Sequence, residues 1–122
     1  MENKFIVKDS GKREHFNTGC KRDIRTEKGR YDLIPPYSLR RLALVYERGA
    51  VKYDDNNWMK GMPISRCIDS ALRHIDEYKM GMIDEDHVAQ AAWNLFSVMH
   101  YQEMIDKGIL PKELDDMYKY KK

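Results

Sequence analysis

Residues 84–99 read DEDHVAQAAWNLFSVM, and this stretch decides the fold class. It opens with three acidic residues, which favour the positively polarised N-terminal end of a helix. Apolar residues then recur at the spacing of one helical face, so we predict a helix over residues 86–106. The members of that face are Val88, Ala91, Ala92, Leu95, Val98, Met99 and Ile105. This apolar arc is broad, which predicts burial on two sides, one of them against another subunit.

Two further stretches show the same helical period. One covers residues 38–53, after the Pro35-Pro36 pair, with Ser38 as its expected N-cap. The other covers residues 64–80 and ends before Gly81. The expected inner faces are Leu39, Leu42, Ala43, Tyr46, Ala50 and Tyr53 on the first helix, and Ile64, Ile68, Ala71, Leu72, Ile75 and Tyr78 on the second.

We therefore predict an all-α fold, a bundle of three main helices completed by oligomerisation. Residues 1–37 carry three glycines and two prolines without a sustained period, and we expect a basic, irregular arm and loop there. Residues 38–122 form the expected bundle domain, with a short final helix or a frayed tail after residue 108. At 122 residues the chain is most simply a single domain overall.

Charge and composition narrow the classes of function. The net charge of +2 argues against general attraction to nucleic acid, although residues 1–30 hold nine Lys/Arg against five Asp/Glu. This basic arm suits phosphate contact or simple solubilisation. Two cysteines are too few for a disulfide framework. No apolar run has membrane-spanning length and no signal-peptide core is present, so we expect a cytoplasmic protein without a membrane partner.

Several polar residues lie beside the apolar faces. Glu47 falls among small apolar neighbours, which predicts either an ion pair with Arg40 or a role as a metal carboxylate. His74 and Glu77 lie one turn apart on one helical surface. His87 and Asn94 lie beside the buried stripe of the third helix. An i,i+4 pair of Asp69 and Arg73 is expected on the second helix.

Three blocks carry a resemblance to a known family: GRYDLIPPYSLRRLALVYERGAVKYDDNNW, DSALRHIDEY and DEDHVAQAAWNLF. They look like the phage-borne family of dATP/dGTP diphosphohydrolase N-terminal domains, grouped with the MazG-like all-α nucleoside triphosphate pyrophosphohydrolases. The resemblance covers about residues 28–103. It implies an oligomeric helical bundle, in the host cytoplasm if phage-encoded, that splits a purine deoxynucleoside triphosphate (dGTP or dATP) into monophosphate and pyrophosphate with Mg²⁺ or Mn²⁺.

MazG-like enzymes hold their metals with an E-x-x-E pair and an E-x-x-D pair on successive helices. Here the first pair falls on His74 and Glu77, and the second falls on His87 and Gln90. Two imidazoles favour Mn²⁺ or another transition metal over Mg²⁺, which prefers oxygen. Alternatively the acids come from elsewhere, and the candidates are Glu47, Asp54, Asp69, Glu85 and Asp86.

Phosphoanhydride hydrolysis sets the remaining expectations. We expect the catalytic carboxylates to be Glu47 and Glu77. The expected metal ligands are Glu47, His74, Glu77, Asp86 and His87. Phosphate and base contacts are expected from Lys28, Arg30, Tyr31, Lys52, Asn57, Trp58, Lys60, Arg73 and Asn94.

Two other classes of function stay open. One is a binder or sponge that holds a nucleotide, or a nucleotide-like signal, without hydrolysing it. Only Glu77, among the four positions aligned with the two metal-binding pairs, is a carboxylate, and this favours a binder over an enzyme. The other is a DNA-associated helical module led by the basic arm, for which steep salt dependence would be the sign. The sequence lacks a turn-containing pair of recognition helices, so we rank this second alternative last.

Overall fold

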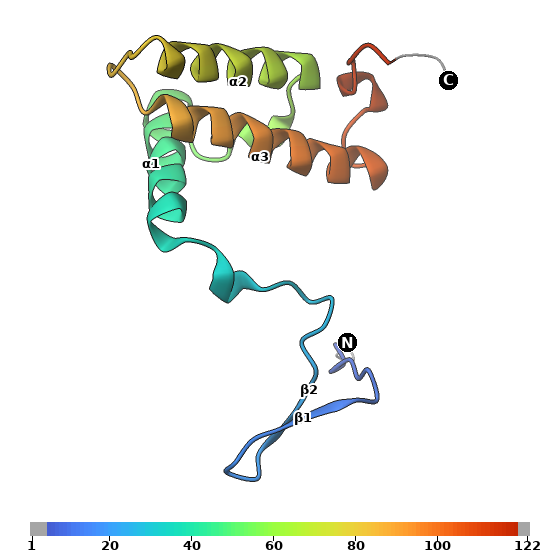
Figure 1. Cartoon of the computed structure of the whole chain (residues 1–122). Coiled ribbons are helices and arrows are strands. Elements are labelled where there is room, and N and C mark those ends of the chain that lie inside the picture. The colour runs from blue at the N-terminus through green and yellow to red at the C-terminus, as the bar shows by residue number, and fades with distance from the viewer. Residues whose placement is uncertain (1–4, 120–122) are drawn as a thin grey trace. The chain divides into compact units, whose positions relative to one another are not determined.

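The computed structural model describes residues 5–119, and most of them are helical (Figure 1). The three main helices are α1 (Pro36–Tyr53), α2 (Ile64–Lys79) and α3 (His87–Asp106). Each bound lies within two residues of the expected one, so the all-α prediction is confirmed. Three short 3-10 helices accompany them: η1 (Tyr31–Leu33), η2 (Asn57–Lys60) and η3 (Lys112–Leu114). The expected short final helix is the single turn η3.

The chain divides into two compact units at the junction of Ile34 and Pro35. The N-terminal unit contains an antiparallel hairpin, β1 (Arg13–His15) with β2 (Lys21–Asp23), in which Glu14 lies opposite Arg22. An arm without strands was expected, and that expectation is wrong for these residues. Strands of three residues are too short to show an alternating pattern. The Gly19 N–H, which donates to the Phe16 carbonyl at 2.9 Å, helps to close the turn.

The start of α1 differs from the expectation at its cap. The helix begins at Pro36, two residues before the expected cap Ser38, and Pro35 occupies the cap position without a side-chain hydrogen bond. A proline suits the first helical position because its fixed φ is helical and its missing N–H would have had no partner there. The Pro-Pro pair therefore sets the boundary, and Ser38 lies inside the first turn.

The core lies mainly between α2 and α3, which are the most closely packed pair of helices. Its buried members are Ile64, Cys67, Val98 and Tyr101. The Tyr101 side chain is fully buried, and its hydroxyl donates to the Trp58 carbonyl at 2.6 Å. This bond ties η2 to α3. α1 packs against α3, so α3 is the central element of the helical unit.

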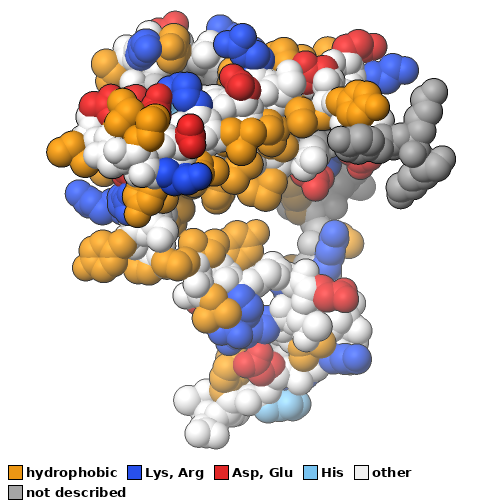
Figure 2. Space-filling view, turned by 45° about the horizontal axis from the view of Figure 1, so that its top comes forward, with side chains coloured by type: hydrophobic (Ala, Val, Ile, Leu, Met, Phe, Trp, Pro, Cys, Tyr) orange, Lys and Arg blue, Asp and Glu red, His pale blue; other side chains and the backbone are white. Residues whose placement is uncertain are grey.

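Many apolar side chains that were expected to face inward are exposed in this single chain. On α2 and α3 these are Leu72, Ile75, Tyr78, Val88, Leu95 and Met99. Phe96 of α3, which was not part of the expected face, is exposed too. Leu39 and Tyr53 of α1 are exposed as well. Figure 2 shows hydrophobic side chains gathered between charged ones on the helical unit. Three helices can cover only part of one another's apolar surface, so the broad arc of α3 is not covered on all sides.

None of the helices in residues 5–119 combines the length and the apolar character that a membrane span needs.

Candidate metal centre

The end of α2 and the start of α3 bring together three side chains that were expected to bind metal. His74 and Glu77 lie one turn apart on α2, and His87 is the first residue of α3. A short connection turns the chain back. Gly81 takes a φ of +80°, and its N–H donates to the Tyr78 carbonyl while Met82 N–H donates to the Glu77 carbonyl. This helix-ending turn, which favours glycine, lets α3 begin opposite the last turns of α2.

Three ligand-type atoms converge in this place. His74 Nδ1 lies 2.9 Å from His87 Nδ1. Glu77 Oε2 lies 3.1 Å from His87 Nδ1 and 3.7 Å from His74 Nδ1. Both imidazoles are buried, whereas the Glu77 side chain is 18% exposed. Glu85 completes the group, since one ligand atom from each of the four residues lies within 4.8 Å of the others.

These atoms fit a divalent cation. If the proton of His87 lies on Nε2, toward Asp84, only the single N–H of a neutral His74 can lie among these three atoms, whereas a divalent ion would meet a lone pair on each of them. The three separations define a circle of about 1.9 Å radius through the atoms. One point therefore lies about 2 Å from each, the length of a bond from imidazole nitrogen or carboxylate oxygen to an ion such as Zn²⁺.

Outer contacts hold the cluster in place. His87 Nε2 lies 2.8 Å from Asp84 Oδ1, and this hydrogen bond lowers the pKa of the Asp84 carboxyl. Arg73 Nη1 donates to Glu77 Oε1 at 3.1 Å. Burial lowers the pKa of His74, and the neighbouring Arg73 guanidinium lowers it further. A lowered pKa favours the neutral imidazole, which is the form that binds metal.

Asp86 and Glu47, both expected as metal ligands, are not in this group. Asp86 caps α3 by accepting from Ala89 N–H at 3.2 Å, so one of the three acids expected at this helix start acts as its cap. Its carboxylate also accepts two bonds from Arg41, at 2.8 and 2.6 Å, and this pairing lowers the pKa of Asp86. Glu47 is exposed on α1, so the expectation of a carboxylate enclosed by apolar neighbours is wrong. No ion pair joins Glu47 to Arg40, both of which are described.

The residues of the helical unit that were expected to contact substrate differ in their burial and in their partners. Arg73 pairs with Glu77, whereas its expected pairing with Asp69 is absent from the described ion pairs. Asn94 is buried and donates to the Gln90 carbonyl at 2.9 Å, a contact within its own helix. Trp58 is half-buried, and its ring contacts those of Tyr46 and His100. The remaining expected contacts of this unit are Lys52 and Lys60, which are exposed, and Asn57, which is half-buried in η2.

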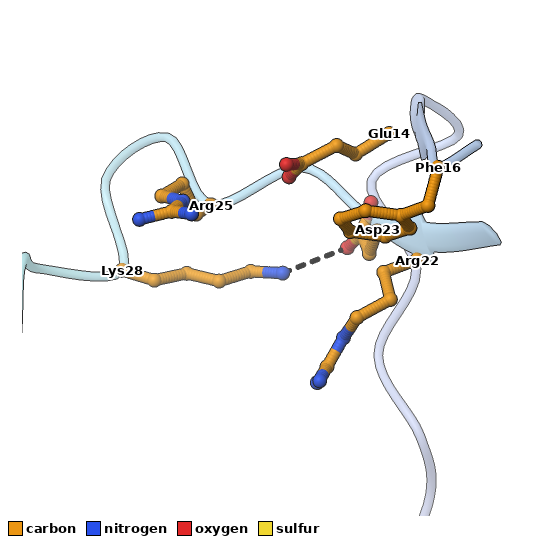
Figure 3. A pocket seen from close by; sticks show the side chains of 6 residues that line it. All are labelled: Glu14, Phe16, Arg22, Asp23, Arg25 and Lys28. Carbon is orange, nitrogen blue, oxygen red and sulfur yellow. Dashed lines mark hydrogen bonds and ion pairs between the residues drawn. The ribbon is translucent and has the colours of Figure 1, made fainter. Parts of the chain in front are cut away.

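The other expected contacts belong to the N-terminal unit. Lys28 Nζ donates to Asp23 at 3.1 Å, and Asp23 also accepts from Ser10 N–H at 3.2 Å. Arg30 makes a two-bond pair with Asp32, while Tyr31 is exposed. A hollow of about 310 Å³ in this unit is lined by the side chains drawn in Figure 3: Glu14, Phe16, Arg22, Asp23, Arg25 and Lys28.

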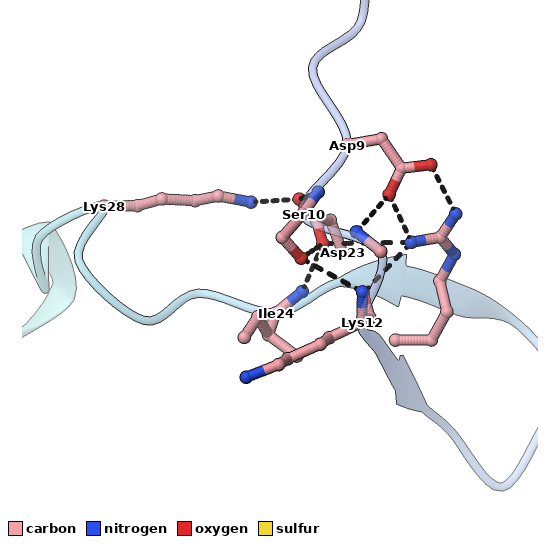
Figure 4. Close-up of polar contacts among 8 residues, drawn as sticks. Asp9, Ser10, Lys12, Asp23, Ile24 and Lys28 are labelled. Carbon is pink, nitrogen blue, oxygen red and sulfur yellow. Dashed lines mark hydrogen bonds and ion pairs between the residues drawn. The ribbon is translucent and has the colours of Figure 1, made fainter.

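Figure 4 shows the polar contacts around Asp23, and the Ser10 and Lys28 hydrogen bonds lower the pKa of this carboxyl to about 2. The cations expected to meet phosphate here therefore already have carboxylate partners.

Sequence reasoning did not single out Asp84, and it offered Glu85 only as an alternative source of acid. Asp84 stands three residues before His87 but lies in the bend that precedes α3, so helical spacing gives no signal for this contact.

Comparison with known families shows the family of this chain. A family model described as "dATP/dGTP diphosphohydrolase, N-terminal" matches residues 18–109. The matched region includes α1, α2 and α3 and all four residues of the cluster. The chain belongs to this family of dATP/dGTP diphosphohydrolase N-terminal domains. No curated protein and no solved structure gives a significant match.

Proposed function

We propose that this protein hydrolyses a purine deoxynucleoside triphosphate, dATP or dGTP, to the monophosphate and pyrophosphate with the help of a divalent metal ion. The observation that carries the proposal is the convergence of His74 Nδ1, His87 Nδ1 and Glu77 Oε2 around one point. The description of the family supports the substrate and the reaction.

The cluster residues would hold Mg²⁺ or Mn²⁺. A divalent ion bound there would neutralise charge on the phosphate oxygens and favour attack by water. Glu77 is the proposed carboxylate ligand on α2, beside His74, and its second oxygen is fixed by Arg73. Glu85 is the exposed member of the cluster, and its carboxylate is suited to orient the attacking water. Glu47 remains a proposed catalytic carboxylate from α1, although it lies outside the cluster.

Substrate binding needs cations for the phosphates and a polar or aromatic surface for the base. Of the proposed phosphate contacts, Lys52 and Lys60 are exposed and make no ion pair among the described residues. Asn57 and Trp58 of η2 are the proposed contacts to the purine. Arg73 would act on the substrate through Glu77, because its guanidinium is committed to that carboxylate.

We further propose that the protein works as a homo-oligomer. Leu95, Phe96 and Met99 of α3 are each 44–52% exposed, and Leu72 of α2 is 60% exposed. Contiguous exposed side chains of this size are typical of protein–protein contact surfaces.

The test is incubation of the protein with each of the four deoxynucleoside triphosphates and Mg²⁺ or Mn²⁺, with the products separated by chromatography. We expect monophosphate and pyrophosphate from dATP or dGTP. Glu77→Gln should abolish product formation, and Glu47→Gln tests the carboxylate of α1. Asp76→Asn, an exposed acid on α2, is the matched control. If the nucleotide binds but is recovered intact under every condition, the protein is a binder and the proposed hydrolysis is refuted.

A further inference from the structure

We propose that Asp84 is a positioning residue, which fixes the ring of His87 so that its Nδ1 faces a divalent transition-metal ion. The inference rests on the proposed function in one respect, that the cluster binds an ion. Asp84 is not one of the proposed metal ligands, and its proposed role is to orient one of them, His87.

The His87 ring has its two nitrogens in different surroundings. Nε2 lies 2.8 Å from Asp84 Oδ1, while Nδ1 faces His74 Nδ1 and Glu77 Oε2. A carboxylate only accepts hydrogen bonds, so Nε2 must carry the proton of this contact. In the neutral ring Nδ1 is then the nitrogen with a free lone pair. Metal-binding histidines characteristically donate their other N–H to a carboxylate or a carbonyl, which fixes the ring and raises its basicity.

Helix capping does not account for the position of Asp84. The capping hydrogen bond to Ala89 N–H comes from Asp86, two residues further along. The Asp84 side chain is 60% exposed, whereas the His87 side chain it contacts is 1% exposed. Asp84 thus reaches from the surface to one nitrogen of a buried ring. This is the geometry expected of an outer partner to a metal ligand.

Glu77 is held in a corresponding way. Arg73 Nη1 donates to Oε1 at 3.1 Å, which leaves Oε2 directed at the two imidazoles. Two of the three converging ligands therefore have an outer partner on the side away from the shared point. His74 differs, because its Nε2 is 3.5 Å from Arg73, at the limit of a hydrogen bond.

The donor set indicates the class of ion. Two imidazole nitrogens with carboxylate oxygen suit Mn²⁺, Co²⁺ or Zn²⁺, whereas Mg²⁺ prefers a shell of oxygens. Co²⁺ is the most useful probe, since its visible absorption reports nitrogen ligands and coordination number directly.

The experiment is a titration of the metal-free full chain with Co²⁺, followed by visible absorption. Wild type, Asp84→Ala, Asp84→Asn and the control Asp76→Ala are compared. We expect Asp84→Ala to weaken Co²⁺ binding roughly 10- to 100-fold. Asp84→Asn should lose less, because its amide oxygen can still accept from Nε2–H. Asp76→Ala removes an exposed carboxylate from α2 and should bind as wild type does.

A second readout separates positioning from a general effect on folding. In the Zn²⁺-loaded wild type, long-range ¹H–¹⁵N spectra should show His87 protonated at Nε2 and metal-bound at Nδ1, and Asp84→Ala should shift the Nε2 resonance. Equal Co²⁺ affinity in wild type and Asp84→Ala, with wild type binding the ion, overturns the inference and leaves the proposed function standing. Failure of wild type to bind Co²⁺ and Mn²⁺ overturns the inference, and it overturns the proposed function as well if Mg²⁺ supports no product formation.

Discussion

His74 Nδ1 and His87 Nδ1 lie 2.9 Å apart, although 13 residues separate the two histidines in the chain. Neither imidazole is on the surface, and Glu77 Oε2 is the third atom in contact with both. A buried group of nitrogens and a carboxylate oxygen costs free energy unless a cation or a proton satisfies it. The relationship therefore predicts that stability depends on divalent ions.

Removal of metal should destabilise the protein. At an ion concentration 100 times its dissociation constant, the free energy of unfolding should rise by about 2.7 kcal/mol over the metal-free protein. His87→Leu should abolish this increase because it removes a ligand from the centre of the cluster. Thermal unfolding with Mn²⁺ and with excess chelator measures both effects. His15→Leu, on the exposed hairpin, is the control. An equal Mn²⁺ effect in wild type and His87→Leu would place the ion elsewhere.

Acid should release the C-terminal segment from α2 through Asp116. Its carboxylate accepts from Ser65 Oγ at 2.6 Å and from Ser65 N–H at 2.9 Å, so it acts as a cap for α2. The Ser65 side-chain bond, followed by the backbone bond, lowers the pKa of Asp116 below its usual 3.8. A lowered folded-state pKa means that the contribution is full above pH 3.8 and is lost as the pH falls through the folded value.

Asp116→Asn should remove this pH-dependent contribution, since an amide keeps an acceptor but does not titrate. Acid unfolding followed by circular dichroism should show a shallower loss of stability below pH 4 than in wild type. Asp55→Asn, at an exposed loop position, should leave the acid transition unchanged. Identical transitions in wild type and Asp116→Asn would show that the cap contributes nothing in solution.

The helices were predictable from the sequence because their signals are local. Pro35-Pro36, Gly81 and the acids before His87 are boundary residues whose effects act within one turn. The pairing of His74 with Glu77 follows from helical spacing alone. The hairpin at Arg13–His15 and Lys21–Asp23 was missed because its strands are too short for a period.

The full cluster could not be predicted, because it depends on how two helices meet. The distance from His74 to His87 is set by the turn at Gly81, not by either helix. Glu47 is a residue for which the helical pattern gave a wrong prediction of burial. Its helical position beside apolar residues suggested burial, but α1 packs mainly on α3 and leaves this side of the helix in solvent. A single-helix pattern cannot show which face another element covers.

Tyr101→Phe should destabilise the protein without disturbing the metal centre. The hydroxyl donates to the Trp58 carbonyl at 2.6 Å, and the side chain is fully buried. The Trp58 carbonyl keeps the Gly61 N–H as a second donor at 3.2 Å, so the substitution removes one hydrogen bond, which costs about 0.5–1.5 kcal/mol. Urea unfolding measures the change, and the Co²⁺ titration should be the same as for wild type. A change below about 0.5 kcal/mol would show that water replaces the hydroxyl, since surface substitutions have effects of that size.

The exposed apolar face of α3 should hold the subunits of the proposed oligomer together. Phe96 is 47% exposed and neighbours Leu95 and Met99, so a charge introduced there would be buried on association. We expect Phe96→Glu to give a monomer in sedimentation experiments at concentrations where wild type is associated. Val51→Glu is the matched control, because Val51 is 87% exposed on α1 and outside this face. If Phe96→Glu sediments as wild type does, with both associated, the contact between subunits uses another surface. If wild type itself is a monomer, the apolar face of α3 stays open to solvent and the proposed oligomer does not exist.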